Sequence, residues 1–290
     1  MEQARRSPPA AFRDQFDRPI FIVNTPRSGS TLLFETLAQA PGLYTIGGES
    51  HRLIEGIPTL SPAARDWASN QLTAGDADAE IVEQLARAFY EQLRDRGGQP
   101  PAGRVRMLEK TPKNSLRVPF FDAAWPDAIF VYLYRDARQS LSSMIEAWLS
   151  GRFRTYPRLP GWQGPPWSML LVPGWQRLDG RPIPQIVAEQ WAATTGILLD
   201  DLARIPRKRL RTIVHGELLA SPQAEMERLA TSLDLDWDRS LGPELPLSRH
   251  TVSRPSADKW RTIEKVIEAV WPIVDKADSR ARAFVESLRT

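Results

Sequence analysis

The sequence predicts an α/β protein with a central parallel sheet and helices on both faces of that sheet. Short runs rich in β-branched and aromatic residues alternate along the chain with longer segments of helical periodicity. This alternation is typical of a parallel sheet that is buried on both sides. The chain has 290 residues, of which 42% are hydrophobic and 25% are charged, so it is long enough and apolar enough to bury such a core.

Four apolar runs are expected to form the core strands, because each is short, rich in branched side chains and bounded by polar or turn-forming residues. The first of them leads through a loop over residues 24–31 into a helix that Pro41 and Gly42 end. A further short strand is expected over residues 44–46. The four core strands are predicted at residues 20–23, 105–108, 129–134 and 210–214.

Helices are expected between these strands. Ser61 followed by Pro62 is typical of a helix start and predicts a helix over residues 63–72. A helix from about Lys113 is expected to be interrupted at Pro119. Other helices are predicted over residues 81–89, 136–148 and 185–203, and one more from Ser221 and Pro222.

The chain is expected to form one domain over residues 18–290, after a flexible polar arm over residues 1–17. Residues 151–184 break the alternation, because they hold seven prolines together with Trp162, Trp167 and Trp175. Long segments without periodicity inside a compact domain are usually functional. This Pro/Trp-rich segment, called the lap below, is either a surface excursion packed on its own aromatics or a loop that covers the substrate and shapes an acceptor pocket.

Composition excludes several classes of function. The net charge of +3 is too small to indicate nucleic-acid binding. The chain has no cysteine and only three histidines, which excludes disulfides and a cysteine nucleophile and argues against a metal cluster. No apolar run is long enough for stable membrane insertion, and residues 1–16 lack the apolar core of a signal peptide. A cytoplasmic, metal-independent enzyme or binding protein is therefore expected, with its oligomeric state open.

The loop after the first predicted strand, TPRSGSTLL, has the composition of an anion-binding cradle. Gly29 permits close backbone approach, while Arg27 supplies a permanent cation and the residues Ser28, Ser30 and Thr31 supply hydroxyl groups. The following helix would add unpaired N–H groups at its start. The spacing differs from a Walker A loop, because no Lys follows Gly29. An ordinary turn with a Ser/Thr cap is the alternative interpretation.

A second anion site is predicted at the end of the strand over residues 129–134. Arg135 follows that strand and Ser143 lies eight residues later in the predicted helix. A guanidinium group binds phosphate well because it is planar and always charged. Taken alone, Arg135 could instead form a salt bridge with Asp136.

Together, the PRSGST loop and the R-x7-S pattern resemble the sulfotransferases that use 3′-phosphoadenosine-5′-phosphosulfate (PAPS), in a form similar to the tyrosylprotein enzymes and to bacterial members, including those associated with polyketide synthases. The resemblance extends over roughly residues 19–262 through the segments EKTPKN, VHGELLASP and SRPSADKW. It implies the P-loop-kinase-like sulfotransferase fold, PAPS as co-substrate, PAP as product and no metal. The PRSGST loop would bind the 5′-phosphosulfate, and Arg135 with Ser143 would bind the 3′-phosphate.

The resemblance also implies a catalytic base in the segment GGESHRL. Glu49 matches a Glu that serves as the base in the tyrosylprotein enzymes, and Glu49 with His51 reproduces an E-x-H pattern of the polyketide-synthase relatives. On a strand, these two side chains would share a face. His51 has the pKa better matched to pH 7, whereas burial would be needed to raise that of Glu49. A surface ion pair between Glu49 and Arg52 is the alternative.

Four further residues enter through the same resemblance. Lys110 matches a Lys that reaches the transferring sulfonate together with Arg27, although it could instead pair with Glu109. Lys259 and Trp260 resemble parts of a carboxyl-terminal loop that closes over the nucleotide, and Arg254 of the same loop would contact a phosphate. Trp260 could instead belong to a core stripe with Ile263 and Ile267.

The expected function is sulfonate transfer from PAPS to a hydroxyl of a small-molecule, lipid or carrier-bound acceptor by in-line displacement. The tryptophans of the lap favour an apolar or bulky acceptor. Two other classes of function remain open. A P-loop nucleotide kinase shares the core but needs the missing Lys, and a non-catalytic nucleotide-binding module would need the cradle without Glu49 or Lys110.

Overall fold

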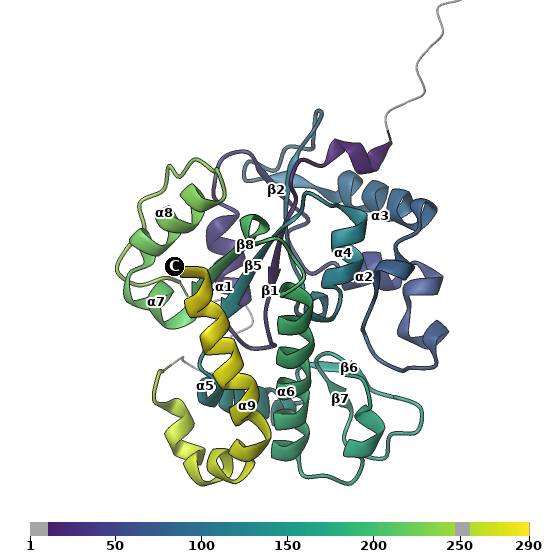
Figure 1. Ribbon diagram of the computed structural model, residues 1–290, viewed down its shortest axis with the longest axis vertical. Helices are drawn as coiled ribbons and strands as arrows, with labels where there is room; N and C mark the ends of the chain where they lie inside the picture. Colours follow the sequence, from purple (N-terminus) through teal and green to yellow (C-terminus); the bar gives the residue numbers. More distant parts are fainter. Residues whose placement is uncertain (1–10, 247–255, 290) are drawn as a thin grey trace, which may run out of the picture.

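The computed structural model describes residues 11–246 and 256–289 of the chain. Its main sheet has the strand order β3-β2-β4-β1-β5-β8 (Figure 1), and all pairings are parallel except that of β3 with β2. The predicted fold class, a mostly parallel sheet flanked by helices, is confirmed. The strands of this sheet are β1 (Ile20–Val23), β2 (Leu43–Thr45), β3 (Arg94–Asp95), β4 (Arg106–Lys110), β5 (Ile129–Tyr134) and β8 (Leu210–Val214).

Alternating side chains of the central strands face two separate hydrophobic clusters. Ile20 and Ile22 of β1 pack in a cluster with α1 (Ser30–Leu37), α7 (His215–Ala220) and α8 (Pro222–Ser232). Phe21 and Val23 lie in the opposite cluster, which also holds residues of the helices on that face. Those helices are α3 (Ala79–Gln92), α4 (Val118–Ala124), the carboxyl-terminal half of α6 (Ile183–Leu202) and the end of α9 (Glu264–Arg289).

A third cluster joins the lap to α5 (Ala137–Ser150), α6 and α9 beyond the end of the sheet (Figure 1). The lap carries a small antiparallel ribbon of β6 (Arg154–Tyr156) and β7 (Trp167–Ser168). Trp167 and Trp175 are fully buried and lie edge to face with ring centroids 5.9 Å apart. Aromatic packing therefore fixes the lap, and part of the same segment also faces the cavity described below.

Two local predictions need correction. The helix expected over residues 63–72 is wrong, because the helical turn at Pro62–Arg65 stops where Asp66 and Trp67 adopt left-handed backbone conformations. The tertiary reason is the lap: the carbonyl of Trp67 accepts a hydrogen bond from the Trp175 indole at 2.7 Å. At the amino end, residues 11–17 pack as part of the domain rather than extending from it, since Phe16 is only 2% exposed.

Among the other predicted helices, α5 and α6 lie within two residues of the expected ends. The helix expected from Lys113 is instead a 3-10 helix over Pro112–Leu116, and Pro119 lies in the first turn of α4 rather than interrupting a helix. The long helix α9 had not been assigned from the sequence, although Ile267 was recognised as part of an apolar stripe. In the described part of the chain, no helix combines the length and the apolar character needed to cross a membrane.

Candidate active site

A cavity of about 850 Å³ lies at the carboxyl-terminal ends of β1, β4, β5 and β8. Residues that directly follow each of these strands line it, as expected for ligand sites in open α/β sheets. The other walls come from α5, from the lap and from the segment that precedes α9. Predicted site residues in the lining are Arg27, Gly29, Ser30, Thr31, Glu49, His51, Arg135, Ser143 and Lys259.

The loop between β1 and α1 is a tight turn that exposes the start of the helix to the cavity. Arg27 and Gly29 both have left-handed backbone conformations, with φ of 65° and 91°, and α1 begins at Ser30 directly after Gly29. Ser28 differs from its predicted role, because its hydroxyl is buried and donates to the carbonyl of Thr25 at 2.8 Å. The side chains of Ser30 and Thr31 line the cavity.

Arg27, Arg135 and Ser143 form one connected group. The guanidinium of Arg135 donates to the carbonyl of Arg27 at 2.8 Å, and Nε of Arg27 donates to Oγ of Ser143 at 3.2 Å. Burial, and then the positive charge of Arg27, lower the pKa of Arg135 to about 10. Two cations held this close to each other favour an oxyanion beside them. Arg27 thus lies with the predicted 3′-phosphate residues, although the sequence had assigned it to the opposite end of the nucleotide.

His215, at the end of β8, packs directly against the cradle. A Cβ atom added to Gly29 would lie 2.3 Å from Cδ2 of His215, so only glycine fits at this position. Burial, and then the charge of Arg135, lower the pKa of His215 to about 3, which leaves the imidazole neutral at pH 7. His215 had not been selected from the sequence as a site residue. Its place in VHGELLASP, directly after a core strand, was the available signal.

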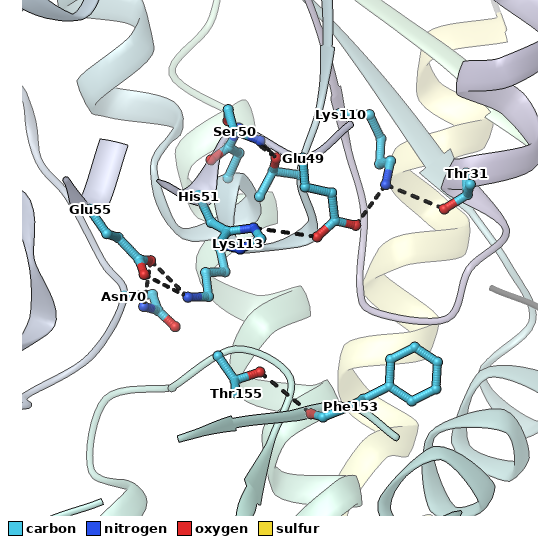
Figure 2. Close-up of polar contacts among 12 residues, drawn as sticks. Thr31, Glu49, Ser50, His51, Glu55, Asn70, Lys110, Lys113, Phe153 and Thr155 are labelled. Carbon is cyan, nitrogen blue, oxygen red and sulfur yellow. Dashed lines mark hydrogen bonds and ion pairs between the residues drawn. The ribbon is translucent and has the colours of Figure 1, made fainter. Parts of the chain in front are cut away.

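Glu49, Lys110 and Thr31 form a continuous chain of contacts (Figure 2). Nζ of Lys110 lies 2.7 Å from Oε1 of Glu49 and donates to Oγ1 of Thr31 at 3.3 Å. The Lys110 side chain is 1% exposed, whereas that of Glu49 is 31% exposed and reaches the cavity. Lys110 therefore pairs with Glu49 and not with its neighbour Glu109. The contacts connect the candidate base directly to the anion cradle.

His51 lies next to Glu49, but a strand does not place it there. The segment leaves the sheet after Thr45, and His51 is the first residue of α2 (His51–Glu55). The expectation of a shared strand face is therefore wrong, yet Nδ1 of His51 still lies 3.8 Å from Oε2 of Glu49. Burial, and then the positive charge of Lys113, lower the pKa of His51. His51 is consequently neutral at pH 7 and could accept a proton.

Glu109 anchors the loop that carries Glu49. Its fully buried carboxylate accepts hydrogen bonds from Ser50, Thr111 and Asn114, each at 2.6 Å. The backbone N–H of Ser50 also donates to Oγ1 of Thr111 at 2.8 Å. Burial raises the pKa of Glu109 against the opposing effect of these donors. The network holds the residue next to Glu49 against the end of β4, and so fixes the direction of the Glu49 side chain.

A second polar cluster lies beside His51, on the side of the cavity that faces the lap. Nζ of Lys113 lies 2.8 Å from both carboxylate oxygens of Glu55 and donates to the hydroxyl of Tyr156 at 3.0 Å. Arg117 also bonds to Glu55, at 2.6 Å. Burial opposes ionisation of Glu55, but the two cations outweigh it and keep the pKa of Glu55 below its usual value. No pattern in the sequence indicated Glu55 or Tyr156, and Lys113 lay within the EKTPKN segment without an assigned role.

The segment before α9 forms the remaining wall. Lys259 starts a 3-10 helix, Lys259–Ile263, and pairs with Glu146 of α5 at 2.6 Å. Trp260 also lines the cavity rather than joining the core stripe, whose member Ile267 is fully buried. Arg254 lies outside the described residues. Within residues 11–246 and 256–289, no group of three or more Asp, Glu or His side chains could hold a metal ion.

This chain is similar to known proteins over most of its length. A family model described as the sulfotransferase family matches residues 19–239. Protein-tyrosine sulfotransferase A of Caenorhabditis elegans is 23% identical over 76% of this chain and 50% of its own length. Nodulation protein NoeE of Sinorhizobium fredii is 23% identical over 88% of this chain and 62% of its own length. The chain thus spans between half and two thirds of these two relatives.

Among solved structures, a sulfotransferase from Alicyclobacillus acidocaldarius superimposes with a TM-score of 0.51 at 17% identity, covering 94% of this chain and all of that one. This likeness shows that the two chains share the fold. The family match runs from the start of β1 past the end of α8 and includes the cradle, Glu49, Lys110 and Arg135. Because it spans most of the chain, this protein belongs to the sulfotransferase family.

Proposed function

We propose that the chain transfers a sulfonate group from PAPS to a hydroxyl group of a small-molecule, lipid or carrier-bound acceptor. The observation that carries this proposal is the contact of Lys110 with both Glu49 and Thr31. It joins a candidate proton acceptor to the anion cradle inside one cavity. A binding module would not need this connection. Transfer does need it, because the base must lie beside the group that is transferred.

The residues present fit a nucleotide that is anionic at two ends. Gly29 leaves room that a Cβ atom would fill, next to the start of α1 and the hydroxyls of Ser30 and Thr31. Arg27, Arg135 and Ser143 supply the charge-assisted donors for a second anion. We assign the 3′-phosphate to this group, and the 5′-phosphosulfate to the cradle with Lys110. Lys259, which lines the cavity, would cover the nucleotide.

PAPS supplies an activated sulfonate, and the chain's own residues supply binding, direction and a proton acceptor. Glu49 takes the proton of the acceptor hydroxyl as the new oxygen–sulfur bond forms and the bond from sulfur to the phosphate oxygen breaks. Lys110 lies between Glu49 and the cradle, so it offsets the negative charge that grows on the departing oxygen. His51 helps to orient Glu49, whereas Arg27 acts on the 3′-phosphate with Arg135 and Ser143.

The apolar wall of the cavity favours an acceptor with an apolar body. Phe153, Met169 and Leu170 of the lap line the cavity. The ring of Phe153 also packs on the guanidinium of Arg27, with 4.7 Å between the ring centroid and Cζ. An acceptor placed against these side chains would have Glu49 within reach of its hydroxyl. The lap would then act as the acceptor wall that its composition suggested.

Calorimetry with PAP, followed by transfer of labelled sulfonate from PAPS, tests the proposal. Binding of PAP without Mg²⁺, together with transfer to a hydroxyl compound, is the expected result. Hydrolysis of ATP would favour the nucleotide kinase instead, although the cradle lacks the Lys of a Walker A loop. Binding of PAP without transfer to any hydroxyl compound would favour the non-catalytic module.

A further inference from the structure

The hydroxyl of Tyr156 has one hydrogen-bond donor that no described residue uses. Its oxygen accepts two hydrogen bonds, from Nδ2 of Asn70 at 2.6 Å and from Nζ of Lys113 at 3.0 Å. The ammonium group of Lys113 can only donate, and Asn70 is fixed in orientation because its Oδ1 accepts from the N–H of Leu171 at 2.6 Å. Both lone pairs of Tyr156 are therefore occupied, and its own O–H must donate elsewhere.

The cavity is the remaining place where the O–H group of Tyr156 can find an acceptor. Burial, and then the negative charge of nearby Glu55, raise the pKa of Tyr156, but no hydrogen bond joins the side chains of Tyr156 and Glu55. Tyr156 lines the cavity beside Phe153, Met169 and Leu170, although only 8% of the residue is exposed. A buried donor without an acceptor is costly, so an acceptor atom on a bound molecule would be favoured here.

The ring of Tyr156 is held firmly in this orientation. Trp67 packs against it edge to face, with ring centroids 5.7 Å apart. Asn70 is itself buried, and its backbone is paired with Leu171 and with the guanidinium of Arg117. Figure 2 shows Asn70, Glu55 and Lys113 together on the side of the cavity next to His51, with Phe153 and Thr155 of the lap across from Glu49. The donor is thus oriented in advance, within the cluster of Asn70 and Lys113 beside His51.

We propose that Tyr156 determines acceptor specificity by donating its O–H to an oxygen atom of the acceptor other than the hydroxyl that is sulfonated. The acceptor is then a hydroxyl compound that also carries a carbonyl or a similar hydrogen-bond acceptor on an otherwise apolar body. Lys113 and Asn70 act as positioning residues, since they hold the phenol oxygen and leave its proton for the acceptor. This inference rests on the proposed sulfonate transfer.

Matched acceptors that differ by one carbonyl group test the inference. Suitable pairs are 4-hydroxyacetophenone with 4-ethylphenol, 3-hydroxyacetophenone with 3-ethylphenol, and 4-hydroxy-2-butanone with 1-butanol. The wild-type enzyme with labelled PAPS is expected to prefer the carbonyl member of at least one pair by about tenfold in kcat/KM, the value of one well-placed hydrogen bond. Tyr156→Phe is expected to remove the preference by lowering only the rate with the carbonyl member.

Tyr90→Phe is the matched control, because its hydroxyl bonds to the carbonyl of Gly103 at 3.0 Å, away from the cavity. It should leave the preference unchanged. A merely structural role of Tyr156 would lower the rates with both members equally, together with the melting temperature, and would overturn the inference. A preference that survives Tyr156→Phe would also overturn the inference, and so would the absence of transfer to every carbonyl compound. PAP affinity is measured in parallel, because a protein that does not bind PAP would show that the proposed function itself is wrong.

Discussion

Lys110 and Glu49 lie 61 residues apart in the chain, yet Nζ of one is 2.7 Å from Oε1 of the other. The end of β4 and the loop before α2 bring them together, and the Glu109 network fixes that loop. A fully buried ammonium group needs a charged partner. Lys110 therefore holds Glu49 at the edge of the cradle, where a proton acceptor is required.

The first prediction concerns Glu49 as the base. Glu49→Gln keeps the shape of the side chain but removes its basic oxygen, so kcat should fall by roughly 100-fold or more. PAP affinity should barely change, because Glu49 faces the acceptor. Single-turnover transfer at saturating PAPS measures the first effect, and calorimetry measures the second.

His51→Gln is the comparison that assigns the roles. It should lower kcat less than Glu49→Gln does, because His51 is expected to act through the orientation of Glu49. The opposite order would make His51 the base. In that case activity would fall at pH values below 6.5, because burial and Lys113 lower the pKa of His51, and the pH profile of kcat would show this acid limb.

The second prediction concerns the group formed by Arg27, Arg135 and Ser143. Arg135→Ala should weaken PAP binding by roughly tenfold to more than a hundredfold, since each charge-assisted hydrogen bond contributes about 1.5–3 kcal/mol. Ser143→Ala should cost less, because the hydroxyl of Ser143 supplies a single donor, whereas the guanidinium of Arg135 supplies several donors and a positive charge. Isothermal titration with PAP gives both values, and unchanged affinity in Arg135→Ala would reject the assignment.

A comparison of PAP with ADP tests the same group without a mutation. A ligand that binds only the folded state stabilises it by RT ln(1 + [L]/Kd), so at equal concentration the tighter ligand raises the melting temperature more. PAP should therefore protect the wild-type enzyme more than ADP does, and this difference should shrink in Arg135→Ala. Equal protection by both nucleotides would mean that no 3′-phosphate site exists.

The fold and half of the site could be predicted from the sequence because their signals are local. A strand such as β5 is a continuous apolar run, and the cradle is a contiguous segment ahead of a helix. Tertiary contacts override such signals elsewhere. Trp67 adopts a left-handed backbone where the helix pattern continued, because its carbonyl bonds to Trp175 of the lap.

The other half of the site depends on contacts between distant segments. Glu55, Lys113 and Tyr156 come from α2, from the segment after β4 and from the lap, and no spacing within the sequence connects them. The same reason explains Arg27. Its place in the PRSGST loop indicated the cradle, but its reach to Ser143, 116 residues further along the chain, follows only from the packing of α5 beside α1's loop.

The third prediction concerns His215 and acid stability. Its pKa is lowered to about 3 in the folded state by burial and then by Arg135, against about 6.5 in an unfolded chain. The unfolded state therefore binds the extra proton first, so the contribution of His215 to stability is complete above pH 6.5 and decreases as the pH falls toward 3. By pH 4.5 the loss should reach about 2–3 kcal/mol.

Chemical denaturation at pH 7 and at pH 4.5 measures this loss in the wild-type protein and in His215→Gln. The variant should lose less stability between the two pH values, whatever its stability at pH 7. His51→Gln serves as the control, because the side chain of His51 is 40% exposed and solvates its charge more easily. Equal losses in wild type and His215→Gln would show that His215 is not buried as described.

The fourth prediction concerns Gly29, where two separate costs coincide. Its φ of 91° strains any other residue, and an added Cβ would lie 2.3 Å from the ring of His215. Gly47 has a φ of 69° with no atom within 4 Å of an added Cβ, so Gly47→Ala measures backbone strain without a clash. Gly47→Ala should cost about 1 kcal/mol of unfolding free energy. Gly29→Ala should cost clearly more and should also abolish PAP binding, because the methyl group enters the cradle.

In the double variant Gly29→Ala/His215→Ala the clash is removed while the strain stays, so stability should recover part of the way toward that of His215→Ala alone. Additive losses in this double-mutant cycle would mean that Gly29 and His215 do not touch.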